Sequence, residues 1–187
     1  MQDSYILNVA GVERTLPLCS ISDELKIAAF VILGDVELTS ACARELIKKL
    51  PEHDIMITAE AKGIPLIHEM ARQMGVKNYL VARKAQKLYM QEPISVEVQS
   101  ITTSKKQVLY IDKTDSLSLQ GKRVVIIDDV ISTGESVFAV EKLVKMSGGT
   151  VVGRAAILAE GDAKYRDDII FLEYLPLFTS DGTPLKK

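Results

Sequence analysis

Short runs of valine and isoleucine alternate along this chain with segments whose apolar residues recur at helical spacing. Continuous apolar runs, as opposed to alternating ones, are typical of strands that are buried on both faces of a sheet. This order predicts an α/β fold with a mostly parallel central sheet and helices on both faces. The predicted strands are Asp54–Ala59, Asn78–Ala82, Arg123–Asp128 and Val151–Ala159, and the predicted helices are Val36–Leu50, Ile64–Met74 and Glu135–Met146.

One segment departs from this order. Apolar and polar residues alternate over Ile94–Thr102, a polar stretch follows at Thr103–Lys106, and a second strand-like run spans Gln107–Ile111. The pattern predicts an antiparallel β-hairpin inserted between two parallel strands. Its position alone fits either a surface decoration or a flap over a site. Residues 179–187, at the end of the chain, are expected to form a turn and a loose end.

Composition restricts the class of protein. The 187 residues suffice for one domain with a substantial core, and 23 Lys and Arg against 25 Asp and Glu give a net charge of −2. This balance argues against a disordered chain and against nucleic acid as a partner. The two cysteines have no CxxC spacing and are expected to be free thiols in a reducing compartment.

The sequence also predicts no membrane partner. The longest purely apolar run, Ile27–Leu33, has seven residues, whereas a spanning helix needs roughly 20. The first residues lack the basic region of a secretory signal. We therefore expect a soluble, cytoplasmic protein.

The segment with the clearest chemistry is V-V-I-I-D-D-V-I-S-T-G-E-S at residues 124–136. A buried strand leads into Asp128 and Asp129, and Ser132–Ser136 opens a helix shortly afterwards. Ligands of α/β proteins bind where a parallel strand ends and a helix begins. The free N–H groups and positive end of the helix favour a phosphate at this place.

The other side chains of this segment narrow the ligand further. Thr133 and Ser136 offer hydroxyl donors, and Gly134 lets the backbone close around a phosphate. The two carboxylates would repel a phosphate but can accept hydrogen bonds from sugar hydroxyls. The segment thus favours a ribose 5-phosphate, although a polar strand end followed by an ordinary helix cap is the alternative. Neither GxxxxGK[ST] nor GxGxxG occurs, so nucleoside triphosphates and dinucleotides are not favoured.

Residues 124–136 resemble the 5-phosphoribosyl-1-pyrophosphate (PRPP) motif of type I phosphoribosyltransferases. The resemblance is good over residues 55–160 and weaker over residues 1–50, where the family builds a hood over its base. It implies one phosphoribosyltransferase domain over residues 1–187, with Asp128 and Asp129 holding the ribose hydroxyls. The loop that would bind the 5′-phosphate consists of Val130, Ile131, Ser132, Thr133, Gly134, Glu135 and Ser136.

Two further segments carry the resemblance. Thr58–Gly63 (TAEAKG) resembles the family's pyrophosphate loop, with Lys62 where purine enzymes have Arg or Ser. Arg83-Lys84 ends the next strand as in adenine and xanthine phosphoribosyltransferases, and residues 84–112 resemble the flexible catalytic loop. The residues implied to bind pyrophosphate are Ala61, Lys62, Arg83, Lys84 and Lys87. A net charge of −2 requires such a local concentration of cations, although ordinary solvated charges are the alternative reading.

The resemblance implies transfer of the phosphoribosyl group from PRPP to a purine, which yields a nucleoside monophosphate and pyrophosphate in purine salvage. Asp128, Asp129 and Lys84 would be the catalytic residues. Mg²⁺ would arrive with PRPP, without a direct protein ligand, and would share the stabilisation of the leaving pyrophosphate. Closure of the hairpin would exclude water. A homodimer is expected because the resembling enzymes form one.

The purine base is left open between adenine and an oxopurine. Adenine enzymes carry a Glu in the flexible loop, but residues 98–102 contain no acid and Glu97 is the nearest. Xanthine enzymes have a Lys after the acid that corresponds to Glu160, and this chain has Gly161. Adenine is favoured because Ser132–Ser136 is closer to that enzyme's Ala-Thr-Gly-Gly-Thr.

A different class remains open. A non-catalytic PRPP sensor such as the purine operon repressor shares the motif, but about 50 non-basic residues precede the first core strand here and no helix-turn-helix is evident. A paralogue that binds a nucleotide without turnover is a third reading. Outside the motifs, His53 and His68 are expected to be structural, Tyr89-Met90 either to cover the base or to pack, and Arg14 either to join the hood or to lie on the surface.

Overall fold

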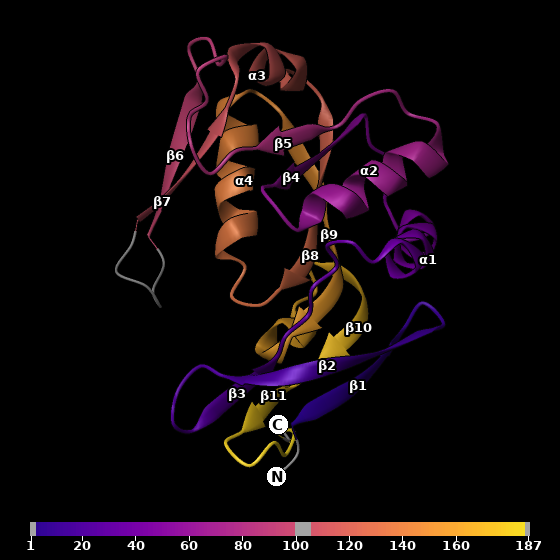
Figure 1. The fold of residues 1–187 in the computed structure, drawn as a ribbon. Coiled ribbons are helices and arrows are strands. Elements are labelled where there is room, and N and C mark those ends of the chain that lie inside the picture. The colour runs from indigo at the N-terminus through magenta and orange to yellow at the C-terminus, as the bar shows by residue number, and fades with distance from the viewer. Residues whose placement is uncertain (1–2, 100–105, 186–187) are drawn as a thin grey trace.

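The computed structural model describes residues 3–99 and 106–185. Its centre is a five-stranded sheet in the order β10-β9-β8-β4-β5, with every neighbouring pair parallel (Figure 1). The predicted parallel sheet is confirmed, and β10 is a strand that the apolar pattern did not predict. The bounds are β4 (Ile55–Ala59), β5 (Leu80–Ala82), β8 (Arg123–Ile131), β9 (Thr150–Glu160) and β10 (Ile170–Leu175).

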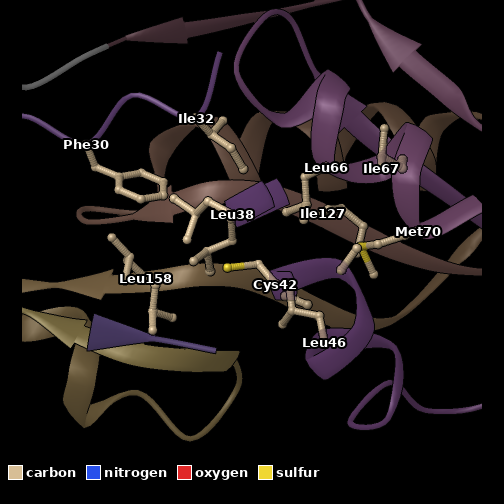
Figure 2. Close-up of a cluster of buried hydrophobic side chains, with 14 of the residues drawn as sticks. Phe30, Ile32, Leu38, Cys42, Leu46, Leu66, Ile67, Met70, Ile127 and Leu158 are labelled. Atoms are coloured by element: carbon tan, nitrogen blue, oxygen red, sulfur yellow. The ribbon is translucent and has the colours of Figure 1, made fainter. Parts of the chain in front are cut away.

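Helices cover both faces of the sheet, as predicted. α1 (Val36–Ile47) and α2 (Gly63–Met74) lie on one face and α4 (Glu135–Met146) on the other (Figure 1). Alternate residues of β8 are buried on opposite faces, because Ile127 packs with α1 and α2 while Ile126 packs with α4. Figure 2 shows the first of these clusters, with Ile127 beside Leu66 of α2 and Cys42 of α1. A short helix, α3 (Lys113–Leu119), was not predicted.

A second, antiparallel sheet, called the hood below, is formed by strands from near both ends of the chain. Its order is β1-β2-β3-β11, with β1 (Ser4–Val9), β2 (Val12–Ser20), β3 (Leu25–Ala28) and β11 (Leu177–Thr179). The expected loose C-terminal end is wrong for the described residues: Phe178 is fully buried and Pro184 pairs back to it across the predicted turn. The sequence of residues 179–187 gave no sign of this, because the buried side chain that anchors them, Phe178, precedes them.

The predicted hairpin is confirmed as β6 (Ile94–Gln99) and β7 (Lys106–Ile111), which pair antiparallel. Residues 100–105 lie outside the described residues, and Lys106, expected in the turn, begins β7. Val96 and Leu109 at the hairpin base are buried with the α4 cluster. The base of the hairpin is thus part of the core. Over the described ranges, no helix has the length and apolar character needed to cross a membrane.

Candidate active site

The two adjacent acids lie inside β8 and not at its end. The strand continues three residues beyond the predicted end at Asp128, to Ile131, because Val130 and Ile131 keep pairing with β9. Neighbouring side chains of an extended strand point to opposite faces of the sheet. Asp129 is buried, with 4% of its surface exposed, and Asp128 is half-buried. The two carboxylates therefore meet different surroundings.

Asp129 is paired with the lysine of the predicted pyrophosphate turn. Lys62 Nζ lies 2.6 Å from Asp129 Oδ2, and the lysine side chain is 44% exposed whereas the aspartate side chain is 6% exposed. A buried carboxylate is tolerated when a cation compensates its charge. Lys62 thus neutralises the ribose-binding candidate Asp129, a contact that the sequence did not predict.

Among residues 3–99 and 106–185, Asp128 forms no ion pair. Its Oδ1 accepts a hydrogen bond from the backbone N–H of Asp129 at 2.9 Å. Burial, followed by the negative charge of Asp129, raises the pKa of Asp128 from 3.8 to about 7. Near neutral pH this carboxyl group can therefore accept a hydrogen bond as an anion or donate one as an acid.

The turn between β4 and α2 approaches its neighbours closely. The Glu60–Ala61 peptide bond in this turn is cis. A Cβ added at Gly63 would lie 2.1 Å from Thr58 Oγ1 and 3.4 Å from the carbonyl oxygen of Ile127. No larger residue fits between β4, β8 and the start of α2 without displacing them. The glycine of the TAEAKG segment is therefore required by packing.

Glu60 joins this turn to the predicted cationic segment after β5. Its carboxylate accepts a hydrogen bond from the backbone N–H of Lys84 at 3.0 Å and contacts Arg83 Nη2 at 3.2 Å. These interactions lower the pKa of Glu60, the hydrogen bond from Lys84 most of all. Sequence reasoning missed Glu60, although its place inside TAEAKG was a usable signal.

The cations of that segment differ in exposure. The Lys84 side chain is exposed and Lys87 is half-buried. Arg83 Nε is buried and has no hydrogen-bond partner among the described atoms. A buried donor without a partner is costly, so this atom is suited to an anionic acceptor. The paired strand ends, with Ala59 opposite Ala82, bring the Ala61 turn and Arg83 to the same edge of the sheet.

The predicted phosphate loop connects β8 to α4 as expected. Gly134 is the residue before the helix and has φ +82°, a conformation that favours glycine. Ser132, Thr133 and Ser136 are exposed, and Glu135 lies in the first turn of α4. The free N–H groups of this helix end therefore face solvent beside three hydroxyl groups.

A residue that the sequence did not single out lies against this loop. A Cβ at Gly134 would be 2.3 Å from Arg166 Nη1. Arg166 follows the 3-10 helix η1 (Gly161–Tyr165), and its Nε and Nη2 donate to Asp168 at 2.9 and 2.8 Å. Arg166 belongs to no sequence motif near the loop, so only the fold reveals this contact.

Two other acids were candidates for the base site. Glu160 ends β9, and burial raises its pKa, although a hydrogen bond from Ser132 opposes the effect. Glu97 lies on the exposed face of β6, because its neighbour Val96 takes the buried face. The acid-free stretch at 100–102 lies outside the described residues.

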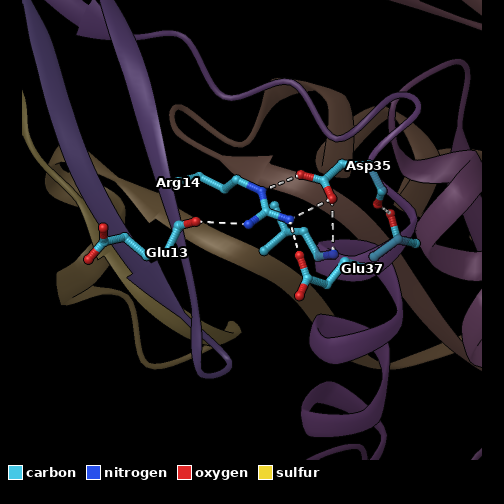
Figure 3. A network of polar contacts seen from close by, with 6 residues as sticks. Glu13, Arg14, Asp35 and Glu37 are labelled. Carbon is cyan, nitrogen blue, oxygen red and sulfur yellow. Dashed lines mark hydrogen bonds and ion pairs between the residues drawn. The ribbon is translucent and has the colours of Figure 1, made fainter.

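Arg14 joins the hood to the start of α1. Its Nε donates to Asp35 at 2.7 Å and its Nη2 to Glu37 at 2.7 Å (Figure 3). Asp35 also caps α1 by accepting from the Leu38 N–H. Arg14 therefore lies on β2 and is held in an ion-pair network, and its place in a hood over the base stays a prediction.

The remaining candidates have structural surroundings. His53 Nδ1 lies 2.8 Å from the Pro51 carbonyl oxygen, and His68 Nδ1 lies 3.3 Å from the Tyr79 hydroxyl. Within residues 3–99 and 106–185, no three His, Cys, Asp or Glu side chains gather as a metal cluster. Tyr89 is 64% exposed. The two histidines thus have structural partners, whereas covering of the base by Tyr89-Met90 stays a prediction.

The strand order, the loop before α4 and the pairing of Lys62 with Asp129 lie at one edge of an α/β sheet, the place where such sheets generally bind ligands. Residues 35–181 match the phosphoribosyl transferase domain family. The chain therefore belongs to this family, and the predicted type I phosphoribosyltransferase fold is confirmed.

The chain is similar to relatives that are named for different purine bases. A hypoxanthine/guanine phosphoribosyltransferase of Methanococcus voltae is 34% identical over 59% of this chain and 55% of its own length. An adenine phosphoribosyltransferase of Rhodococcus jostii is 32% identical over 66% of this chain and 63% of its own length. The chain thus spans less than two thirds of these two relatives. The crystal structure of an adenine phosphoribosyltransferase from Thermoanaerobacter pseudethanolicus has a TM-score of 0.64 and 29% identity, covering 76% of this chain and 84% of that one.

Proposed function

We propose that this protein transfers the 5-phosphoribosyl group of PRPP to a purine base, with release of pyrophosphate, and that adenine is its preferred base. The arrangement of Asp128 and Asp129 directly before the phosphate loop of α4 carries the proposal. A pentose phosphate fits this edge because hydroxyl acceptors and phosphate donors lie next to each other. Membership of the phosphoribosyl transferase domain family supports the reaction type.

Each part of the edge has a role in the proposed reaction. Asp128 and Asp129 accept hydrogen bonds from the ribose hydroxyls, and Lys62 holds Asp129 in place through their 2.6 Å contact. Residues 130–136 bind the 5′-phosphate through backbone N–H groups and hydroxyls. Breaking the bond at the anomeric carbon develops positive charge on the ribose and negative charge on the leaving pyrophosphate. Ala61, Arg83, Lys84 and Lys87 stabilise that leaving group.

Mg²⁺ is proposed to enter with PRPP. This cation prefers oxygen ligands and commonly uses one or two carboxylates together with substrate phosphates. Here the phosphates of PRPP would supply these oxygens, and no carboxylate of the chain is assigned to the cation as a direct ligand. When bound, Mg²⁺ would neutralise charge on the departing pyrophosphate. A homodimer and a cytoplasmic location also belong to the proposal.

The preference for adenine has support of its own. The relative from Rhodococcus jostii and the structural neighbour at 29% identity are both adenine phosphoribosyltransferases. The relative from Methanococcus voltae, named for hypoxanthine and guanine, favours an oxopurine instead. Gly161, which stands where xanthine enzymes carry a Lys, is fully buried against Leu177 and offers no cation to a base carbonyl.

A base panel tests the proposal. Purified protein with PRPP, Mg²⁺ and either adenine, hypoxanthine, guanine or xanthine is assayed for pyrophosphate release. We expect the largest kcat/KM with adenine, and loss of turnover when Asp128→Asn and Asp129→Asn are combined. Turnover of an oxopurine alone would overturn the base preference. Binding of PRPP without turnover of any base would overturn the proposed enzymatic activity and favour a PRPP sensor.

A further inference from the structure

The guanidinium of Arg166 contacts Asp168 on one side and lies against the phosphate loop on the other. Nε and Nη2 are both engaged by the Asp168 carboxylate, which fixes the plane of the group. Nη1 points the other way and lies against Gly134, where an added Cβ would be only 2.3 Å away. Nη1 makes no hydrogen bond within the described part of the chain. Arg166 therefore presents an oriented donor edge at the start of α4.

The surroundings of Arg166 leave it positively charged. Glu141 accepts from Arg154 at 2.6 Å and contacts Lys145 Nζ at 2.6 Å. Arg154 Nη1 lies 3.9 Å from the same Asp168 carboxylate that binds Arg166. Glu141 and Asp168 thus face three cations, and Glu135 on the same cavity brings the formal charges to three of each sign. Hydrogen bonding to Asp168 raises the pKa of Arg166 further, so its charge is constant over the working range of pH.

An open cavity lies between this cluster and the loop. It has a volume of about 330 Å³ and is lined by Thr133, Gly134, Glu135, Phe138 and Arg166, among others. Glu135 places a negative side chain in the first turn of α4, where a phosphate would be repelled by it. A cation at this end of the helix is needed to offset that repulsion, and Arg166 lies against the residue directly before Glu135.

We propose that Arg166 is a phosphate-binding residue of this site, whose Nη1 donates to the 5-phosphate held by residues 132–136. The proposal rests on the proposed function, because it assigns a further residue to the same ligand. Asp168 is the positioning residue that orients the guanidinium. The contact joins the segment after β9 to the loop after β8, so the phosphate would be held from two strands of the sheet.

Binding measurements on the full chain test the assignment. Isothermal titration with ribose 5-phosphate, PRPP and inorganic pyrophosphate is compared between the wild type and Arg166→Gln. One lost charge-assisted hydrogen bond predicts weaker binding of ribose 5-phosphate and PRPP by on the order of tenfold. Pyrophosphate, which the Arg83 edge would hold, should change by less than about twofold. Asp168→Asn should weaken the two pentose phosphates in the same direction but less.

Arg154→Gln is the matched control, because it removes an equal charge from the same cavity without touching Gly134. It should weaken ribose 5-phosphate binding by less than about twofold, clearly less than Arg166→Gln, and thermal melting of each variant checks that the protein is folded. Equal affinity of Arg166→Gln and wild type for ribose 5-phosphate, in a protein that turns over PRPP, would overturn this inference alone. If the wild type binds neither pentose phosphate, the proposed function and this inference both fail.

Discussion

Asp128 and Asp129 are adjacent in the chain, but their carboxylates differ in burial and in their partners. The alternation of β8 places Asp129 on the face where Lys62 precedes α2. It places Asp128 on the other face, where the Asp128 carboxylate accepts the backbone N–H of Asp129. One carboxylate is compensated by a lysine at 2.6 Å, and the other is shifted towards its neutral form by burial and by Asp129. The pair therefore combines a fixed acceptor with a group that titrates near neutrality.

Asp128 should make the stability of the protein depend on pH. Its folded pKa of about 7 lies above the ordinary value of 3.8, so folding favours the protonated form. This contribution is fully present below about pH 4 and is lost as the pH rises through about 7. Asp128→Asn mimics the protonated state and should raise Tm at pH 8 by about 3 °C, equivalent to roughly 1 kcal/mol, while the difference from wild type disappears near pH 4. Thermal melts across this range measure it, and a variant that melts below the wild type at pH 8 would contradict it.

Lys62 should matter for folding as well as for the ligand. Lys62→Met leaves Asp129 buried without its cation, which we expect to lower the free energy of unfolding by about 1–3 kcal/mol, since solvent still reaches the lysine. Lys48→Met is the control, because it breaks an exposed ion pair with Glu45 and should cost less than about 0.5 kcal/mol. Urea unfolding at pH 7 compares the two. Equal losses of unfolding free energy in the two variants would show that the contact between Lys62 and Asp129 stabilises the fold no more than an exposed ion pair does.

For single residues, the sequence identified which side chains belong to the candidate site but not which side chains they contact. Asp128, Asp129 and the Gly134 loop were predictable because a strand, two acids and a helix start follow one another directly. The pairing of Lys62 with Asp129, the link from Glu60 to Arg83 and the approach of Arg166 to Gly134 join distant segments. Such contacts depend on how strands pack side by side, and no local pattern records them.

The turn between β4 and α2 is the element on which the pyrophosphate edge depends. Gly63 stands where α2 passes Thr58 at the end of β4 and the backbone of β8. Local pattern predicted the strand and the helix, yet it placed the helix start one residue late, at Ile64. The glycine that ends TAEAKG is thus a packing requirement of two strands and a helix.

Gly63→Ala should therefore destabilise the protein through a specific clash. The new methyl group would lie 2.1 Å from Thr58 Oγ1, and we expect a loss of about 1–3 kcal/mol. Thr58→Ala removes that oxygen, so the double variant should be more stable than the sum of the two single losses predicts. Urea unfolding of the four proteins of this cycle measures the coupling. Strict additivity would show that the contact is not the cause.

The predictable elements were those with long apolar runs. The four predicted strands and three predicted helices are all present. Burial on both faces gives such strands continuous apolar runs, and the helices show apolar residues at helical spacing. The missed elements are short or half-exposed, and their identity depends on the neighbour that pairs with them. They are β1, β2, β3, β10, β11 and α3. The hairpin was predictable from its alternation, but the burial of Val96 and Leu109 against α4 was not.

In the whole molecule, the hood and the central sheet share one apolar cluster. Leu7 and Leu16 of the hood are buried together with Leu38 of α1 and Leu158 of β9. The last strand, β11, pairs with β3 of the hood after the chain has completed the central sheet. The hood sheet is therefore complete only when β11 has paired with β3. At the site edge, the net charge of −2 conceals cations paired with acids, as in Lys62 with Asp129 and Arg83 with Glu60.

Phe178 tests whether hood and sheet form one cooperative unit. Its ring is fully buried and lies edge-on to Tyr5 of β1 at 5.2 Å between centroids. Phe178→Ala should lower the free energy of unfolding by about 3–5 kcal/mol, because it leaves a cavity between the two ends of the chain. Phe138→Ala, at a side chain that is 56% exposed on α4, removes the same ring and should cost less than about 1 kcal/mol. Since the cluster continues from the hood into the sheet, denaturation followed by circular dichroism and by tyrosine fluorescence should give coincident single transitions for both variants. Two separate transitions in Phe178→Ala, with the hood unfolding first, would show instead that the hood is an independent unit attached to a self-sufficient sheet.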